Sequence, residues 1–169
     1  MPRSIASAPR KISLFGECVD HYGVTSIAAA LSDLRIVVDV DVTSEPHISI
    51  ELINFQHLGD DSRVHRVTHE MLKDCLPVRP DPLSAAIPSP QTAQAVKSAC
   101  FGFAEKIVPL CAAACYLSAY IAPECLWGAG DAAGPRRGLK LTARAVGLPA
   151  DEGLGCSAAF SVATAAALL

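Results

Sequence analysis

Residues 152–169 read Glu-Gly-Leu-Gly-Cys-Ser-Ala-Ala-Phe-Ser-Val-Ala-Thr-Ala-Ala-Ala-Leu-Leu, a glycine-containing turn followed by an uninterrupted helix-forming run. Glycine lets backbone N–H groups approach an anion closely, because no Cβ stands in the way. The first N–H groups of a helix have no partner within the helix, and the positive end of the helix dipole lies behind them. The stretch therefore predicts a phosphate site at the start of a helix over 157–169.

Ser157 stands where this helix is expected to begin, and its hydroxyl has two interpretations. It can bind the Mg²⁺ that accompanies ATP phosphates, because Mg²⁺ prefers oxygen ligands. It can instead cap the helix, with the glycines forming only a tight turn. The loop residues by themselves leave both interpretations open.

Upstream of this turn, hydrophobic alternation predicts a sheet. Residues 26–31 are small and apolar, and form either a buried strand or a helical turn. Residues 34–42 and 47–53 are expected to pair as a hairpin across the turn around Pro46. The segments that alternate in the manner of strands are 11–15, 34–42, 47–53 and 138–146.

Helical composition is found in residues 92–107 and 110–122, with Pro109 between them as a break or kink. Residues 77–90 contain five prolines and are expected to form an internal loop. The elements together predict an α+β fold in which helices cover a mixed or antiparallel sheet. A helix as apolar as 157–169 needs packing partners on most of its faces. The 169 residues are therefore expected to be one incomplete domain.

Composition narrows the class of protein. Hydrophobic residues make up 51% of the chain and charged residues 18%, which excludes an intrinsically disordered protein. The net charge of −3 is scattered without a basic block, so no nucleic-acid partner is expected. The longest apolar stretch, 107–122, is interrupted by Pro109 and predicts a buried helix rather than a membrane span. Seven cysteines without a secretory leader predict reduced thiols and a cytoplasmic location.

Two motifs carry a family resemblance. Residues 153–169 resemble the phosphate loop and following helix of mevalonate kinases, within the superfamily that also includes galactokinases, homoserine kinases and phosphomevalonate kinases. Residues 7–17, Ser-Ala-Pro-Arg-Lys-Ile-Ser-Leu-Phe-Gly-Glu, resemble the family's first motif, Ser-Ala-Pro-Gly-Lys followed by apolar residues and Gly-Glu-His. The motifs stand in the family's order at a similar separation. The resemblance implies the N-terminal domain of this kinase fold, without its C-terminal domain.

The resemblance also implies an activity, namely transfer of the γ-phosphate of ATP to the 5-hydroxyl of mevalonate, a step toward isoprenoids and sterols. ATP, Mg²⁺ and mevalonate are the implied ligands, and the full-length family suggests a homodimer. The residues that the family places after the phosphate-loop helix, including a catalytic aspartate, have no match here. We therefore expect the chain alone not to phosphorylate mevalonate.

Individual roles follow from the same resemblance. Lys11 matches a catalytic lysine beside the transferred phosphate, where its charge would favour ionisation of the attacking alcohol; a solvated strand-edge lysine is the alternative. Glu17 matches a substrate-pocket glutamate, and a surface turn is its alternative. Asn54 matches a nucleotide-contacting asparagine, and an ordinary loop asparagine is equally consistent. The implied ATP-binding residues are Lys11, Asn54, Gly153, Leu154, Gly155, Cys156 and Ser157, with Ser157 also binding Mg²⁺.

Several positions depart from the family pattern. Arg10 replaces the glycine before the motif lysine, and Cys18 replaces the histidine after Glu17. Cys156 replaces the first serine of a pair and exchanges a hydroxyl for a weakly hydrogen-bonding thiol. Asp151 and Glu152 stand where the family has glycine and a small residue.

Other interpretations of the sequence remain open. Residues 17–20, Glu-Cys-Val-Asp, resemble the galactokinase motif Gly-Glu-His-x-Asp and would fit a sugar kinase of the same superfamily, whereas the acidic loop would fit a non-catalytic pseudokinase or interaction protein. His65 and His69, spaced four apart, would share a helix face as a zinc pair or a solvated surface. Cys111 and Cys115 are expected to pack in a core.

The acidic pair generates a first prediction. Two like charges about 4 Å apart repel by roughly 4 kcal/mol at an effective dielectric near 20, and solvent reduces this value. Replacing Asp151 with Gly and Glu152 with Ala is therefore expected to tighten ATP binding, as measured by calorimetric titration. Unchanged affinity in the double variant would refute the idea.

Overall fold

Five strands and five helices are found in the computed structural model, which describes residues 3–16, 22–23, 25–55, 64–76, 89–100, 103, 105–127, 137–150 and 154–169. The strands are β1 (Arg3–Phe15), β2 (Ile27–Thr43), β3 (His47–Ile53), β4 (Val64–Thr68) and β5 (Gly138–Val146). The helices are α1 (His69–Leu72), α2 (Pro90–Ala99), α3 (Val108–Ile121), α4 (Pro123–Trp127) and α5 (Cys156–Leu168).

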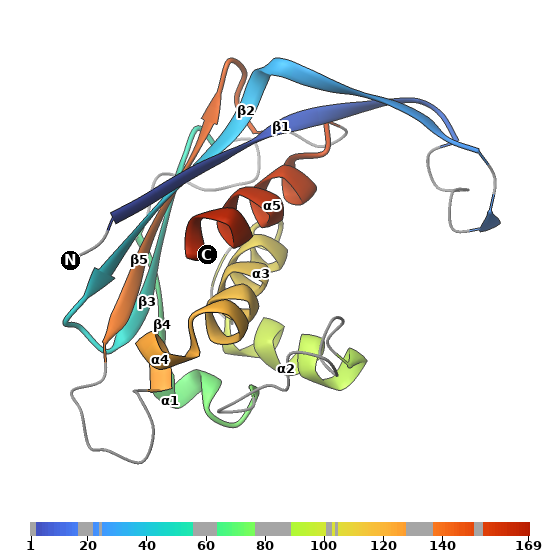
Figure 1. The fold of residues 1–169 in the computed structure, drawn as a ribbon. Coiled ribbons are helices and arrows are strands. Elements are labelled where there is room, and N and C mark those ends of the chain that lie inside the picture. Colours follow the sequence, from blue (N-terminus) through green and yellow to red (C-terminus); the bar gives the residue numbers. More distant parts are fainter. Residues whose placement is uncertain are drawn as a thin grey trace.

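The strands form one sheet in the order β1-β2-β5-β3-β4. The pairs β1–β2, β2–β5 and β3–β4 are antiparallel, whereas β3 and β5 are parallel. Figure 1 shows the helices on one side of this sheet, with α5 beside β1 and β2 and α3 next to α5. The expected α+β fold with a mixed sheet is thus confirmed.

The expected hairpin between residues 34–42 and 47–53 is wrong. Both segments are strands, but β5 lies between them, with Val38 opposite Ala143 on one side and Ile50 aligned with Leu141 on the other. Alternation shows which face of a strand is buried, but it does not show which strand lies beside it. β5, which is distant in sequence, lies between them and pairs with one of these strands along each of its edges.

The core lies between the sheet and the helices. Side chains alternate along the central strands, so that every second residue faces the helices and is shielded from water. Phe160 and Ala163 of α5 pack against this surface and are fully buried. The inward-facing residues of the three central strands are Ile36, Val38, Val40, Ile48, Ile50, Leu52, Leu139, Leu141, Ala143 and Ala145.

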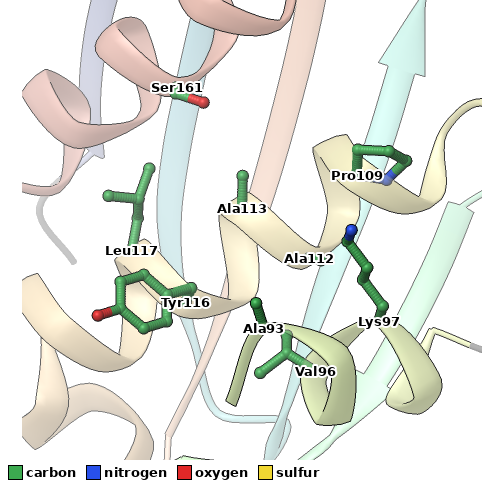
Figure 2. A pocket seen from close by; sticks show the side chains of 9 residues that line it. All are labelled: Ala93, Val96, Lys97, Pro109, Ala112, Ala113, Tyr116, Leu117 and Ser161. Atoms are coloured by element: carbon green, nitrogen blue, oxygen red, sulfur yellow. The ribbon is translucent and has the colours of Figure 1, made fainter. Parts of the chain in front are cut away.

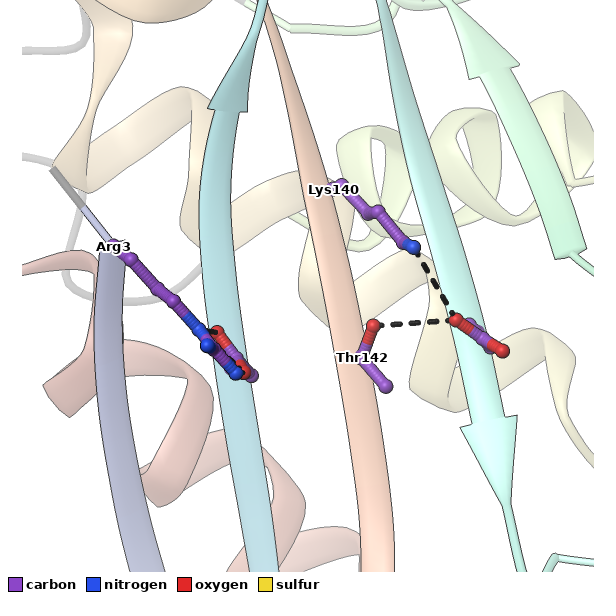
Figure 3. A network of polar contacts seen from close by, with 5 residues as sticks. Arg3, Lys140 and Thr142 are labelled. Atoms are coloured by element: carbon purple, nitrogen blue, oxygen red, sulfur yellow. Dashed lines mark hydrogen bonds and ion pairs between the residues drawn. The ribbon is translucent and has the colours of Figure 1, made fainter. Parts of the chain in front are cut away.

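The opposite face of the sheet carries polar contacts (Figure 3). Arg3 forms an ion pair with Asp39 across β1 and β2, and its hydrogen bonds lower the pKa of the Asp39 carboxyl. On β3, Glu51 accepts a hydrogen bond from Thr142 at 3.3 Å and pairs with Lys140 at 3.7 Å. Exposed ion pairs add little stability, so this face is a solvated surface rather than a second core.

The two strands nearest the N-terminus are longer than their patterns predicted. β1 begins at Arg3 rather than at residue 11, and β2 takes in the segment 26–31 from Ile27 onward. Residues 27–30 are exposed, which corrects the expectation of burial. The reason is visible in Figure 1, where the paired ends of β1 and β2 project past α5.

The helices also begin and end differently from the prediction. α2 ends at Ala99, well before residue 107, and its first residue is Pro90 from the expected loop. Pro109 lies in the first turn of α3 and does not kink it, because a helix start needs no N–H from that position. Residues 77–88 of the proline-rich segment lie outside the described residues. β5 and α5 match their predicted spans within one residue. None of the described helices is long and apolar enough to cross a bilayer.

The position of Ile50 generates a prediction about stability. Its side chain is fully buried in the central part of the sheet, so Ile50→Ala removes packed methyl groups and leaves a cavity. We expect it to lower the free energy of unfolding by about 2–5 kcal/mol. Val162→Ala on the exposed face of α5 is the matched control, with an expected change within about 0.5 kcal/mol. Urea denaturation measures both, and equal losses would contradict the assigned core.

Candidate functional site

The backbone of Lys11 is joined to the predicted phosphate turn. Its N–H donates a hydrogen bond to the carbonyl oxygen of Leu154 at 3.3 Å. A Cβ atom added to Gly155 would lie 2.5 Å from Cγ of Lys11 and 3.3 Å from its backbone nitrogen. The two sequence motifs, more than 140 residues apart, therefore meet in the fold.

Gly155 is required at this place for two reasons. Its φ of 60° is left-handed, a conformation that side chains with a Cβ adopt at a cost. Its missing Cβ also leaves the space that Lys11 occupies. Gly155 is itself the N-cap of α5, and its carbonyl accepts a hydrogen bond from Ala159 at 3.0 Å. The cradle is thus built from backbone, as an anion site at a helix start requires.

Ser157 is exposed within the first turn of α5, and no side chain caps this helix. The interpretation of Ser157 as the N-cap is therefore wrong, because Gly155 holds that position. The hydroxyl of Ser157 lies at the start of the helix, on a residue open to solvent, and this fits an oxygen ligand for Mg²⁺. Cys156, the residue before it, is buried.

Arg10 contacts the segment that follows β5. The Arg10 side chain is fully buried, and its Nη1 donates to the carbonyl oxygens of Leu148 and Pro149, each at 3.1 Å. Leu148 and Pro149 are themselves exposed. The buried guanidinium is therefore bonded to the backbone of two exposed residues.

Asn54 also binds the segment around the end of β5. Its carbonyl oxygen accepts a hydrogen bond from Ala150 N at 2.7 Å, and its Nδ2 donates to Ala145 O at 3.0 Å. Asn54 adopts a φ of 65°, which asparagine tolerates better than most residues. These contacts give Asn54 a structural task at the end of β5, and its contact with a nucleotide stays a prediction.

An irregularity between β1 and β2 places Arg10 toward this loop. Pro9 is paired with Arg35, but Arg10 is paired with Leu31, so residues 32–34 of β2 are passed over. Gly147, with φ of 86°, fits closely against this bulge, because a Cβ there would lie 2.5 Å from Asp33 O. A bulge bends a strand and redirects its side chains, and here it brings the end of β5 and Arg10 together.

The sequence predicted that Lys11 and the glycine turn belong to one site, and the two segments do lie together, but it gave no sign of the contacts of Arg10. Arg10 was noticed only as a departure from a motif glycine, and neither its burial nor its bonds to the loop had a signal in the sequence. Glu17 and Gly153 lie outside the described residues, as do Cys18, Asp151 and Glu152. Their predicted roles therefore stay predictions.

A separate hollow lies on the helical layer (Figure 2). This cavity of about 310 Å³ is bounded by α2, α3 and α5. Its lining is mostly apolar and shares no residue with the phosphate turn. The lining residues are Ala93, Val96, Lys97, Pro109, Ala112, Ala113, Tyr116, Leu117 and Ser161.

The histidine pair does not form the predicted helix face. His65 lies on β4 and His69 begins α1, and both are buried, which corrects the expectation of a solvated surface. Their rings pack against Phe103 and Trp127 with centroid distances of 4.6 and 5.7 Å. In the part of the chain that the structure describes, no three His, Cys, Asp or Glu residues gather as a metal site.

The cysteines behave as predicted. Cys111 and Cys115 of α3 are fully buried in the core. Cys115 lies against Cys100 at the end of α2, where a hydrogen bond between the thiols lowers the pKa of Cys100 and raises that of Cys115. These side chains serve packing and lie apart from the phosphate turn.

Comparison with known proteins supports the fold. A crystal structure of a mevalonate kinase superposes with a TM-score of 0.57 at 21% identity. The aligned region covers 97% of this chain and 39% of the kinase chain. The mevalonate kinase of Methanococcus jannaschii gives a TM-score of 0.53 at 20% identity, with 99% and 39% covered. No protein-family model and no curated protein matches the sequence. The chain thus has the fold of a mevalonate kinase portion and spans 39% of the length of these structures.

The contacts of Asn54 generate a prediction that separates the contribution of its side-chain hydrogen bond from that of its positive φ. Asn54→Gly keeps the positive φ but removes the Nδ2 hydrogen bond, so we expect a loss of about 1 kcal/mol in the free energy of unfolding. Asn54→Ala removes the bond and also strains the backbone, at a further cost of about 1 kcal/mol. Thermal and urea unfolding of both variants measure the difference. Equal stability of the glycine and alanine variants would contradict the role of φ.

Proposed function

We propose that this chain forms the phosphate-binding part of an ATP-dependent kinase of the mevalonate type. The observation that carries the proposal is the contact between Lys11 and Gly155, because it places a lysine against the backbone cradle at the start of α5. The fold comparison supports it, since two structures that superpose on the chain are mevalonate kinases.

Charge and dipole act together at this cradle. The N-terminal end of a helix carries roughly half a positive charge. Lys11 is exposed and its Cγ lies close to Gly155, so its ammonium group would add a full charge on this side of the helix start. A phosphate that binds here would be neutralised from two directions, and its developing charge during transfer would be stabilised in the same way.

Ser157 and Lys11 take different tasks in this proposal. The Ser157 hydroxyl would hold the Mg²⁺ that accompanies ATP, which when bound would supply charge neutralisation for the phosphate oxygens. Lys11 lies where the accepting hydroxyl approaches the γ-phosphate, and its charge lowers the cost of forming an alkoxide.

The reaction proposed is phosphoryl transfer from ATP to the 5-hydroxyl of mevalonate. The oxygen of that hydroxyl bonds to the γ-phosphorus as the bond to the bridging oxygen of ADP breaks, and the hydroxyl proton is released. The protein contributes mainly positioning and electrostatic stabilisation to such a transfer. Glu17 is assigned to the substrate pocket in this proposal.

Nucleotide binding provides the first test. We expect the wild-type chain to bind MgATP in isothermal titration, and Lys11→Met and Gly155→Ala each to weaken binding at least about tenfold, equivalent to 1.4 kcal/mol. Lys11→Met removes the charge, whereas Gly155→Ala brings a Cβ against Lys11. Lys140→Met, on the polar face of the sheet, is the matched control and should bind normally.

The outcomes separate the candidate functions. Absence of MgATP binding by the wild-type chain at millimolar concentration would contradict the proposal. If the chain binds MgATP, release of ADP with mevalonate or with galactose distinguishes a mevalonate kinase from a sugar kinase. Binding without turnover on either is the result expected of this chain alone, whereas absence of MgATP binding would favour the non-catalytic alternative.

A further inference from the structure

Arg10 is an arginine in an environment where arginine is rarely found. Its side chain is fully buried, on the face of β1 that Ala8 also turns toward the helices. Arginine is almost never fully buried unless it is paired. Among the described residues, its Nη1 donates to two neutral carbonyl oxygens, those of Leu148 and Pro149.

The remaining donors of Arg10 make its burial expensive. Among the described residues, Nε and Nη2 have no hydrogen-bond partner. Buried donors without partners cost free energy, and a buried cation costs more. An apolar side chain of similar volume would be expected to stabilise the fold equally well or better. The presence of Arg10 therefore needs an explanation other than stability.

Consecutive residues of β1 hold both ends of one loop. The Arg10 side chain binds the carbonyls of Leu148 and Pro149, where the loop begins. The Lys11 backbone binds the carbonyl of Leu154, where the loop ends. One short piece of strand thus sets the distance between the end of β5 and the phosphate turn.

A guanidinium suits this task because of its shape. It is planar and rigid, so a single nitrogen with two N–H groups can bind two neighbouring carbonyls at a fixed spacing. Lysine presents a compact charge on a flexible stem and holds such a pair less well. The glycine found in the resembled motif has no side chain and could not make these bonds.

We propose that Arg10 is a positioning residue for the phosphate turn, which it fixes by binding the loop at Leu148 and Pro149. It acts through the loop and does not touch the nucleotide. Its importance for nucleotide binding rests on the proposed function, whereas its effect on the loop does not. The two parts can therefore be tested separately in the full chain.

Amide hydrogen exchange tests the effect on the loop. The Lys11 and Ala150 amides donate to Leu154 O and Asn54 O, so their exchange reports the closed loop. In Arg10→Met we expect both to exchange at least about tenfold faster, because local opening becomes easier. The Leu141 amide in the centre of the sheet reports global unfolding and provides the internal reference. The proposal would be overturned if Arg10→Met raised the exchange rates of the Lys11 and Ala150 amides no more than that of the Leu141 amide.

Two further variants sharpen this comparison. Arg35→Met removes an arginine that lies on the neighbouring strand and binds the Ser7 hydroxyl at 3.0 Å, so it should leave the two loop amides unchanged. Arg10→Lys keeps the charge but cannot bind both carbonyl oxygens at a fixed spacing. We therefore expect the Lys11 and Ala150 amides to exchange at rates between those of the wild type and Arg10→Met. Wild-type exchange in Arg10→Lys would refute the need for a guanidinium. If Arg10→Met does not fold, Arg10→Lys carries the same test.

Titration with MgATP tests the link to nucleotide binding. We expect Arg10→Met to weaken MgATP binding about tenfold and Arg35→Met to leave it unchanged. Faster loop exchange with unchanged affinity would overturn this link. A wild-type chain that binds no MgATP, but whose loop still loosens in Arg10→Met, would refute the proposed function and support the positioning role.

Discussion

The hydrogen bond from Lys11 N to Leu154 O joins a strand near the beginning of the chain to the turn that starts its last helix. Its geometry depends on Gly155, whose missing Cβ makes room for the Lys11 side chain. Through this contact α5 is fixed against β1, and the helix N-terminus faces a lysine. The site is therefore a consequence of close backbone packing, in which a side chain larger than hydrogen at Gly155 has no place.

The central position of β5 brings these parts together. Because β5 pairs with β2 along one edge and with β3 along the other, its C-terminal end emerges beside Asn54 and the bulge of β2. The loop after β5 is then held by Asn54 and Arg10 before it reaches the phosphate turn. The central place of β5 therefore both buries its side chains and positions its end beside the site.

Arg10 shows how a site can override local stability. A buried guanidinium whose Nε and Nη2 find no partner among the described residues opposes folding. It nevertheless binds two carbonyl oxygens of exposed residues, Leu148 and Pro149. Asn54 makes a similar compromise by adopting a positive φ. Departures from favourable local chemistry of this kind concentrate where a protein must hold a precise arrangement.

The sequence by itself determined several of the individual elements and predicted a phosphate site at the turn. Alternation identified residues 138–146 as a strand, the apolar run after Gly155 identified a helix, and the two motifs identified Lys11 and the glycine turn as partners. Only the tertiary structure decided that β5 separates β2 from β3, that His65 and His69 are buried, and that Arg10 lies beneath the loop. The physical reason is that periodicity and turn residues record local preferences, which neighbouring residues in the chain determine. Strand order and the partners of a buried side chain depend on contacts between segments far apart in sequence.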